Sequence, residues 1–262
     1  MDQNNFDYLK DQVKFTGFGE SLENDLKRNM EKQVSNFQLQ YPHKFGNDET
    51  IATLNFRKSD QNEMYFFNSY LLAVKQGEND KPLEQTFYVG KDNTFTLKEG
   101  YNLLSGRAVN KDLVNKEKEG YNSWVKLDFT DTDQKGNFKL KHYTEAYGYD
   151  LMEAVSKHPI KELSNADDKK ALIDSLEKGN RQFVTFVIDG KEERRFIEAN
   201  PQYKNVIVYD GSMQKIRLDQ KEKETSGQSA GQEAKKKMSQ KESEGDTGKT
   251  GQDKKRKRGQ HV

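Results

Sequence analysis

The sequence predicts an α+β protein built from antiparallel hairpins, a C-terminal β-meander and about four amphipathic helices, followed by a disordered basic tail. Three observations lead to this prediction. Segments with apolar residues at every second position occur in neighbouring pairs joined by short turns, as in antiparallel sheet. Segments with apolar residues three or four positions apart lie between these pairs and do not alternate with single strands. The residues from 219 onward show neither pattern.

Composition separates a foldable body from the tail. Charged residues make up 33% of the 262 residues and hydrophobic residues 32%, so part of the chain is expected to stay unfolded. All 15 Phe, all 12 Tyr and the single Trp lie before residue 219. We therefore expect a flexible N-terminal arm over residues 1–19, a first α+β subdomain over 20–110, a second over 111–218 and the disordered basic tail over 219–262.

In the first half of the body, the periodicity changes twice. A helix is expected from Ser21, because Leu22, Leu26 and Met30 share one helical stripe. The alternation over Ala52–Phe56, followed by the apolar run Met64–Val74, predicts a hairpin, and Gln85–Val89 predicts a third strand. Thr96 with Glu99 three residues later is typical of a capping box, so a second helix is expected to begin there and to end at Gly106.

The second half repeats the hairpin pattern and ends in a meander. Trp124–Phe129 and Phe138–Tyr143 predict a hairpin. Helices are expected around Leu151–Lys157 and from Ser164 or Asn165 to Gly179. The meander is expected to comprise Phe183–Ile188, Glu193–Glu198, Asn205–Tyr209 and Met213–Leu218, separated by turns at two Asp-Gly pairs and at Asn200-Pro201.

No arrangement of residues predicts catalysis, a metal or a cofactor. The absence of Cys excludes disulfides, thiolate catalysis and zinc sites with sulfur ligands. Asp131–Gly136 opens like a calcium loop, but Lys135 and His142 stand where that loop needs oxygen ligands. We therefore expect a protein without a cofactor that is not an enzyme. The N-terminus has no signal-peptide pattern and no segment has the length of a membrane span, so we expect a cytoplasmic protein without a membrane partner.

Three stretches of the sequence resemble a known family. They are Thr96-Leu97-Lys98-Glu99-Gly100-Tyr101-Asn102-Leu103-Leu104-Ser105-Gly106-Arg107-Ala108-Val109-Asn110-Lys111 with the segment through Trp124 to Asp150, then Lys178–Gln182, then Glu198–Tyr203. They resemble the uncharacterised domain found beside topoisomerase, primase and mobilisation genes in conjugative elements of Bacteroides-type bacteria. The resemblance covers roughly residues 20–215. It implies a mobile-element context, and no residue roles come with it.

Two groups of residues are candidates for nucleic-acid binding. Lys254, Lys255, Arg256, Lys257 and Arg258 form a run of five cations near the end of the tail, which has a net charge of +4 and leaves the first 218 residues at −3. Such a run is typical of segments that contact nucleic acid without sequence preference, although a merely solubilising tail has the same composition.

The second group is Tyr143, Tyr147 and Tyr149, which lie close to Lys139 and Lys141. Aromatic rings beside cations are typical of proteins that stack unpaired bases. Tyrosines that cover a sheet end or contact another protein show the same pattern.

The function hypothesis is a non-catalytic accessory protein of a mobile genetic element, with weak sequence-independent nucleic-acid contact through its tail. DNA, RNA and another protein of the same element are the candidate partners. The alternatives are a protein-binding module such as an inhibitor or immunity-type factor, and a nucleic-acid-processing enzyme whose carboxylates or histidines meet only in the fold.

Overall fold

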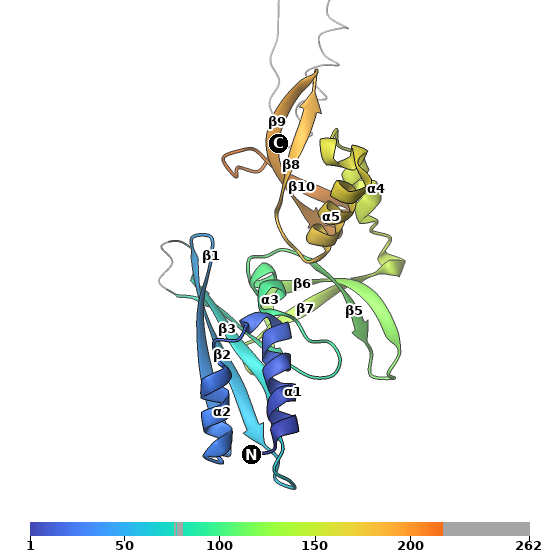
Figure 1. The fold of residues 1–262 in the computed structure, drawn as a ribbon. Coiled ribbons are helices and arrows are strands. Elements are labelled where there is room, and N and C mark those ends of the chain that lie inside the picture. The colour runs from blue at the N-terminus through green and yellow to red at the C-terminus, as the bar shows by residue number, and fades with distance from the viewer. Residues whose placement is uncertain (76, 78–80, 217–262) are drawn as a thin grey trace, which may run out of the picture. The chain divides into compact units, whose positions relative to one another are not determined.

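The computed structural model of the protein describes residues 1–75, 77 and 81–216. Residues 1–216 form one compact unit of antiparallel sheets and helices, so the predicted α+β class is confirmed (Figure 1). The described part of the chain contains three sheets, each made of strands that follow one another in sequence. The tail, with the five cations of residues 254–258, lies outside the described residues.

The first sheet has four strands in the order β1-β2-β3-β4. These are β1 (Asn36–Phe45), β2 (Asp48–Lys58), β3 (Tyr65–Lys75) and β4 (Leu83–Tyr88). The predicted hairpin is β2 with β3, and the predicted third strand is β4. The prediction missed β1, which contains Pro42. Since β1 is an edge strand, Pro42 can pair with Ile51 there without breaking a central ladder.

The first 18 residues are part of the fold, which corrects the prediction of a flexible arm. They form α1 (Gln3–Val13) and the π-helical turn η1 (Lys14–Phe18), which lead into α2 (Glu23–Glu31). The Asp2 carboxylate caps α1 by accepting the Asn5 N–H at 2.8 Å. The helix buries one stripe against β3, comprising Asn5, Phe6, Leu9 and Val13. The apolar stripe predicted for the helix from Ser21 is confirmed in α2, since Leu22, Leu26 and Met30 are all buried.

Asn5 also attaches α1 to the sheet through hydrogen bonds. Its side-chain amide donates to the Tyr65 carbonyl at 3.0 Å and accepts the Tyr65 N–H at 2.7 Å. Tyr65 begins β3 before the pairing with β4 starts at Ser69, so this backbone lies at an uncovered sheet edge. We call a side-chain amide that bonds both the N–H and the C=O of one edge residue an amide clamp.

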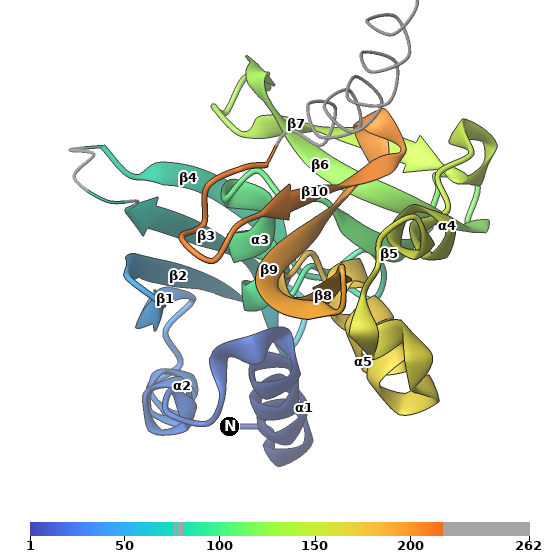
Figure 2. The same ribbon diagram turned by 90° about the horizontal axis from the view of Figure 1, so that it is seen from above.

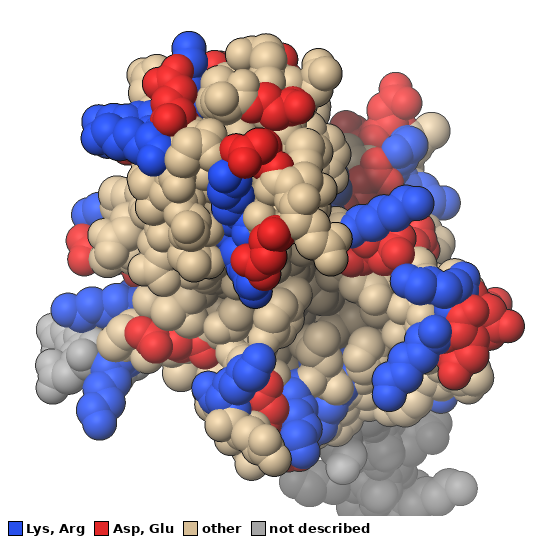
Figure 3. Space-filling model, turned by 90° about the horizontal axis from the view of Figure 1, so that it is seen from below, with Lys and Arg blue, Asp and Glu red and all other residues tan. Residues whose placement is uncertain are grey.

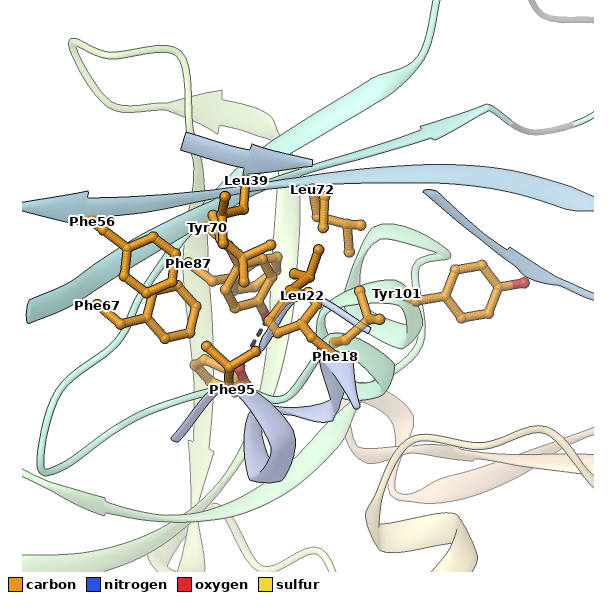
Figure 4. Packing of buried hydrophobic residues seen from close by; sticks show 14 of the residues in the cluster. Phe18, Leu22, Leu39, Phe56, Phe67, Tyr70, Leu72, Phe87, Phe95 and Tyr101 are labelled. Carbon is orange, nitrogen blue, oxygen red and sulfur yellow. Dashed lines mark hydrogen bonds between the residues drawn. The ribbon is translucent and has the colours of Figure 1, made fainter. Parts of the chain in front are cut away.

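Aromatic rings fill the space between the first sheet and these helices. The ring of Phe18 is fully buried and makes edge contacts with Tyr41, Phe67 and Tyr70. Figure 4 shows Phe18 and Leu22 pointing toward Tyr70 and Leu72 of the sheet. The Tyr70 hydroxyl, buried with its ring, donates to the carbonyls of Phe95 and Thr96. The N-terminal segment therefore closes the core of the first sheet.

A short helix connects the first sheet to the second. It is α3 (Leu97–Leu104), and the predicted capping box is confirmed, with Thr96 Oγ1 accepting the Glu99 N–H and the Glu99 carboxylate accepting the Thr96 N–H. The second sheet has the order β5-β6-β7, with β5 (Val109–Val114), β6 (Gly120–Thr132) and β7 (Phe138–Thr144). The predicted hairpin is β6 with β7, whereas β5 was missed.

The third sheet is the predicted meander, in the order β10-β9-β8. The chain reaches it through η2 (Glu145–Tyr147), α4 (Leu151–Ser156), η3 (Lys161–Ser164) and α5 (Ala166–Glu177), then forms β8 (Gln182–Ile188), β9 (Lys191–Asn200), η4 (Pro201–Tyr203) and β10 (Asn205–Tyr209). Figure 2 shows α4 and α5 beside the β5 end of the second sheet. Of the expected last strand, the described residues keep one bridge, between Tyr209 and Lys215.

The second sheet contributes to both hydrophobic clusters of the body. Val125 and Leu127 on one face join the cluster of the first sheet, while Trp124 and Tyr143 on the other face join the cluster of the third sheet. The expected subdomain boundary at residue 110 falls inside β5. A sheet with two buried faces joins the two halves, which explains why residues 1–216 are one unit.

Candidate nucleic-acid interface

The structure brings two of the three candidate tyrosines together. The rings of Tyr143 and Tyr147 meet edge to face with centroids 5.0 Å apart, and Tyr143 is buried whereas Tyr147 is 38% exposed. Tyr149 is separate, because its ring packs on Trp124 and its hydroxyl donates to the Asn205 carbonyl. The exposed ring of Tyr147 is thus the one best placed to stack on a base.

A neighbouring tyrosine and lysine come from a distant part of the chain. The Tyr147 hydroxyl donates to the Gln202 carbonyl at 2.8 Å, and the Lys204 ammonium lies 4.9 Å from the Tyr147 ring centroid. Tyr203, between these two residues, is 69% exposed. The sequence predicted a break in the meander at Asn200-Pro201 and a resemblance over Glu198–Tyr203, but no periodicity indicated that Tyr203 or Lys204 would join Tyr147.

Further cations surround these rings. Burial raises the pKa of Tyr143. The charge of Lys141 acts to lower that pKa, whereas nearby Tyr147, Asp128 and Tyr203 act to raise it further. Burial also lowers the pKa of Lys126, with Glu198 opposing and the ammonium groups of Lys215 and Lys141 adding to the effect. Lys126 and Lys141 are cross-strand partners on β6 and β7, and Lys141 also forms an ion pair with Asp128 at 2.7 Å. These residues form one surface with those of the β9-β10 turn. We call it the tyrosine-lysine surface: Lys126, Lys141, Tyr143, Tyr147, Tyr203, Lys204 and Lys215.

The last described residues lie beside this surface. Lys215 bridges to Tyr209, and the Ile216 N–H donates to the Val208 carbonyl at 2.8 Å. Ile216 is the last residue that the structure describes before the tail. The basic tail, from residue 219, therefore follows Lys215 of the tyrosine-lysine surface by four positions in the sequence.

The three stretches that carry the family resemblance meet in a network of buried hydrogen bonds. The Asn102 side chain donates to the Lys178 carbonyl at 2.6 Å and to Asn180 Oδ1 at 3.0 Å, and accepts from the Arg107 guanidinium at 2.7 Å. Arg107 also donates to the Gly179 carbonyl at 3.0 Å. These contacts hold α3 and β5 to the end of α5, so the first two stretches have a structural role.

The third stretch joins through a carboxylate. Glu198, 7% exposed, accepts from Arg181 Nε at 3.1 Å and from the Tyr209 hydroxyl at 2.7 Å. Burial, together with this hydrogen bond and the Glu198 charge, raises the pKa of Tyr209 to about 12. A buried carboxylate with two donors is satisfied as a structural ion pair. We therefore assign structural roles to these stretches: the first two join α3 to the end of α5, and the third forms an ion pair within the third sheet.

Polar side chains elsewhere are also engaged in local structure. The Asp133 carboxylate of the loop that resembles a calcium site accepts the backbone N–H groups of Lys135 and Asn137, and these hydrogen bonds, that of Asn137 first, lower its pKa. Within the described residues, no group of three or more His, Asp or Glu side chains is arranged to hold a metal ion. No helix in the described ranges has the length and apolar content needed to cross a membrane.

Comparison of the chain with protein families, with curated proteins and with solved structures found no match.

Proposed function

We propose that the protein is a non-catalytic accessory protein of a mobile genetic element that contacts nucleic acid weakly and without sequence preference. The basic tail supplies the main electrostatic contact, and the tyrosine-lysine surface adds stacking of unpaired bases. The observation that supports this most is that the described chain ends next to Lys215, on a surface that presents the exposed rings of Tyr147 and Tyr203. The sequence resemblance supports the mobile-element context.

Charge favours a single strand over a duplex as the ligand. The first 218 residues carry a net charge of −3, which disfavours neutralising the many phosphates that a duplex presents. On the face seen in Figure 3, Lys and Arg side chains are interspersed with Asp and Glu. Two exposed rings with a few lysines suit a short unstacked segment, because stacking needs only a free base face.

The first test measures binding of a fluorescent oligo-dT strand to the full chain in about 50 and 200 mM salt. Each of the five cations at 254–258 can release a counterion, and for a single strand the salt slope changes by about 0.7 per neutralised phosphate. Replacing all five by Gln should therefore lower the slope by up to about 3.5 and remove most of the affinity. The fold should be unchanged, which circular dichroism will check.

The contribution of the surface is tested with Tyr203→Leu, and Tyr8→Leu is the matched control. Tyr203 and Tyr8 are 69% and 60% exposed, so both changes remove a surface ring of similar accessibility. Since stacking one base is worth about 1–3 kcal/mol, Tyr203→Leu should weaken oligo-dT binding by roughly tenfold and leave duplex binding unchanged. Equal affinity of the two variants would remove the surface from the proposal, and unchanged binding without the five cations would remove the tail.

A further inference from the structure

A cleft separates the edge strands of two different sheets. It lies between β4 of the first sheet and β7 of the second and has a volume of about 420 Å³. Most of its lining is apolar or aromatic and comes from both strands and their neighbours: Phe87, Tyr88, Phe95, Tyr121, Phe138 and Leu140. Pockets of this size and character are typical ligand sites.

At one end of the cleft, side chains take the place of a paired strand. The Gln85 amide accepts the Phe138 N–H at 2.8 Å and donates to the Phe138 carbonyl at 3.3 Å, so Gln85 is an amide clamp like Asn5. From the other side, Asn137 Oδ1 accepts the Thr86 N–H at 2.9 Å. Two sheet edges therefore face each other here, and each is satisfied by an amide from the opposite strand.

Further along the cleft the same edges continue without such amides. In an antiparallel strand, successive residues direct their N–H and C=O groups to opposite sides. Phe138 directs its groups away from β6, so Leu140 and His142, two and four residues on, do the same. Both residues line the cleft, and their outward backbone groups have no hydrogen-bond partner within the described ranges. Tyr88, two residues after Thr86, stands in the same position on β4.

We propose that this cleft binds an extended segment of another protein, which pairs with the β7 edge at Leu140 and His142 and inserts an apolar side chain between the strands. The Gln85 amide bonds the N–H and C=O of Phe138 in the way that a peptide group of the partner would bond those of Leu140 and His142. Strand addition supplies affinity through the main chain and selectivity through alternate side chains, which is a common mode of peptide recognition. The inference is independent of nucleic-acid binding.

The composition of the chain and of the cleft points to a separate protein as the source. The protein's own tail from residue 219 has no aromatic residue and is dominated by Lys, Glu, Gln, Ser and Gly, which do not suit an apolar cleft. Side-chain amides that line the cleft are already bonded, since Asn93 clamps both backbone groups of Val114. The groups left to recognise a ligand are then the main-chain edge and the apolar walls, which suit an extended peptide.

The probes are capped heptapeptides that alternate Thr with one apolar residue, either Val, Leu, Phe or Tyr, added to the full chain. Backbone amide hydrogen exchange is measured by NMR. Binding should slow exchange at Leu140 and His142 by tenfold or more, about the effect of one new hydrogen bond, while Phe138, already bonded to Gln85, should change little. Failure of every peptide to bind at about millimolar concentration would overturn the proposal.

Two substitutions locate the binding. Leu140→Ala shortens a side chain that lines the cleft and is 38% exposed, and should weaken binding by about fivefold. Phe66→Ala is the control, because Phe66 is 50% exposed but does not line the cleft. Peptide binding that leaves Leu140 and His142 exchange unchanged, or that both variants weaken equally, would contradict strand addition. Sedimentation of the full chain tests for self-association. If the chain associates with itself through β7, a separate partner protein is contradicted as the occupant.

Discussion

A chain that begins at Gly19 is expected not to fold. The deletion removes Phe6, Leu9, Val13 and Phe18, whose side chains are at most 4% exposed. Burying one such side chain contributes about 1.5–3 kcal/mol, so the loss is about 6–12 kcal/mol. This is comparable to the whole stability of an ordinary domain, about 5–15 kcal/mol. Circular dichroism and thermal melting should show a loss of cooperative unfolding.

The matched control is a chain that ends at residue 216. It loses the polar tail but keeps every residue of the described compact unit, and its melting temperature should stay within a few degrees of the full chain. Asn5→Ala gives a milder test of the same contact. It leaves the Tyr65 N–H and C=O unbonded and should destabilise the protein by about 1–3 kcal/mol. A cooperative, full-amplitude melt of the chain beginning at Gly19 would restore the flexible-arm prediction.

Gly179→Ala is expected to destabilise the protein by about 2–5 kcal/mol. The backbone of Gly179 has a φ of +77°, which costs an L-residue about 1–2 kcal/mol. A Cβ there would also lie 2.7 Å from the Ala108 carbonyl oxygen and 2.9 Å from Val109 Cγ2. Because the first of these atoms is backbone, the joint of α5 with β5 must shift, and overpacking of this kind costs about 1–3 kcal/mol more. Urea unfolding followed by fluorescence of Trp124 measures the change.

Gly190→Ala separates the two contributions. Gly190 has a φ of +73°, but a Cβ there would meet no atom within 4 Å. It should therefore show only the conformational cost, about 1–2 kcal/mol. If the two variants unfold at the same urea concentration, the close approach of Gly179 to β5 does not contribute, and the proposed structural role of the Lys178–Gln182 stretch loses its main support.

Elements with strong local signals could be predicted from the sequence. The capping box at Thr96 and the stripe of α2 involve residues three or four positions apart, and the β2-β3 and β6-β7 hairpins join neighbouring segments. The missed elements have weaker patterns. The stripe of α1 is diluted by polar residues, β1 contains Pro42, and β5 carries Asn, Lys and Asp between its buried Val109 and Leu113. Their stability comes from packing against distant residues, which local patterns do not report.

The candidate interface shows the same limit. Tyr143 and Tyr147 are close in sequence, and their proximity in the fold follows from one turn. Tyr203 and Lys204 reach the same surface only because the third sheet packs against the second, more than fifty residues later. Since that contact joins residues more than fifty positions apart, it could not be predicted without the fold. The tail residues 254–258 remain a prediction from sequence.

The amide clamps of Asn5, Gln85 and Asn93 bear on how this protein behaves at high concentration. Each clamp occupies an edge residue of a sheet, Tyr65 on β3, Phe138 on β7 and Val114 on β5. An edge residue that is already bonded cannot pair with a strand from a neighbouring molecule, so each clamp acts against fibrillar aggregation at its own residue. Removing one amide would leave the N–H and C=O of that edge residue free to pair with a strand of another molecule. Substitution at these three positions is therefore expected to lower solubility as well as stability.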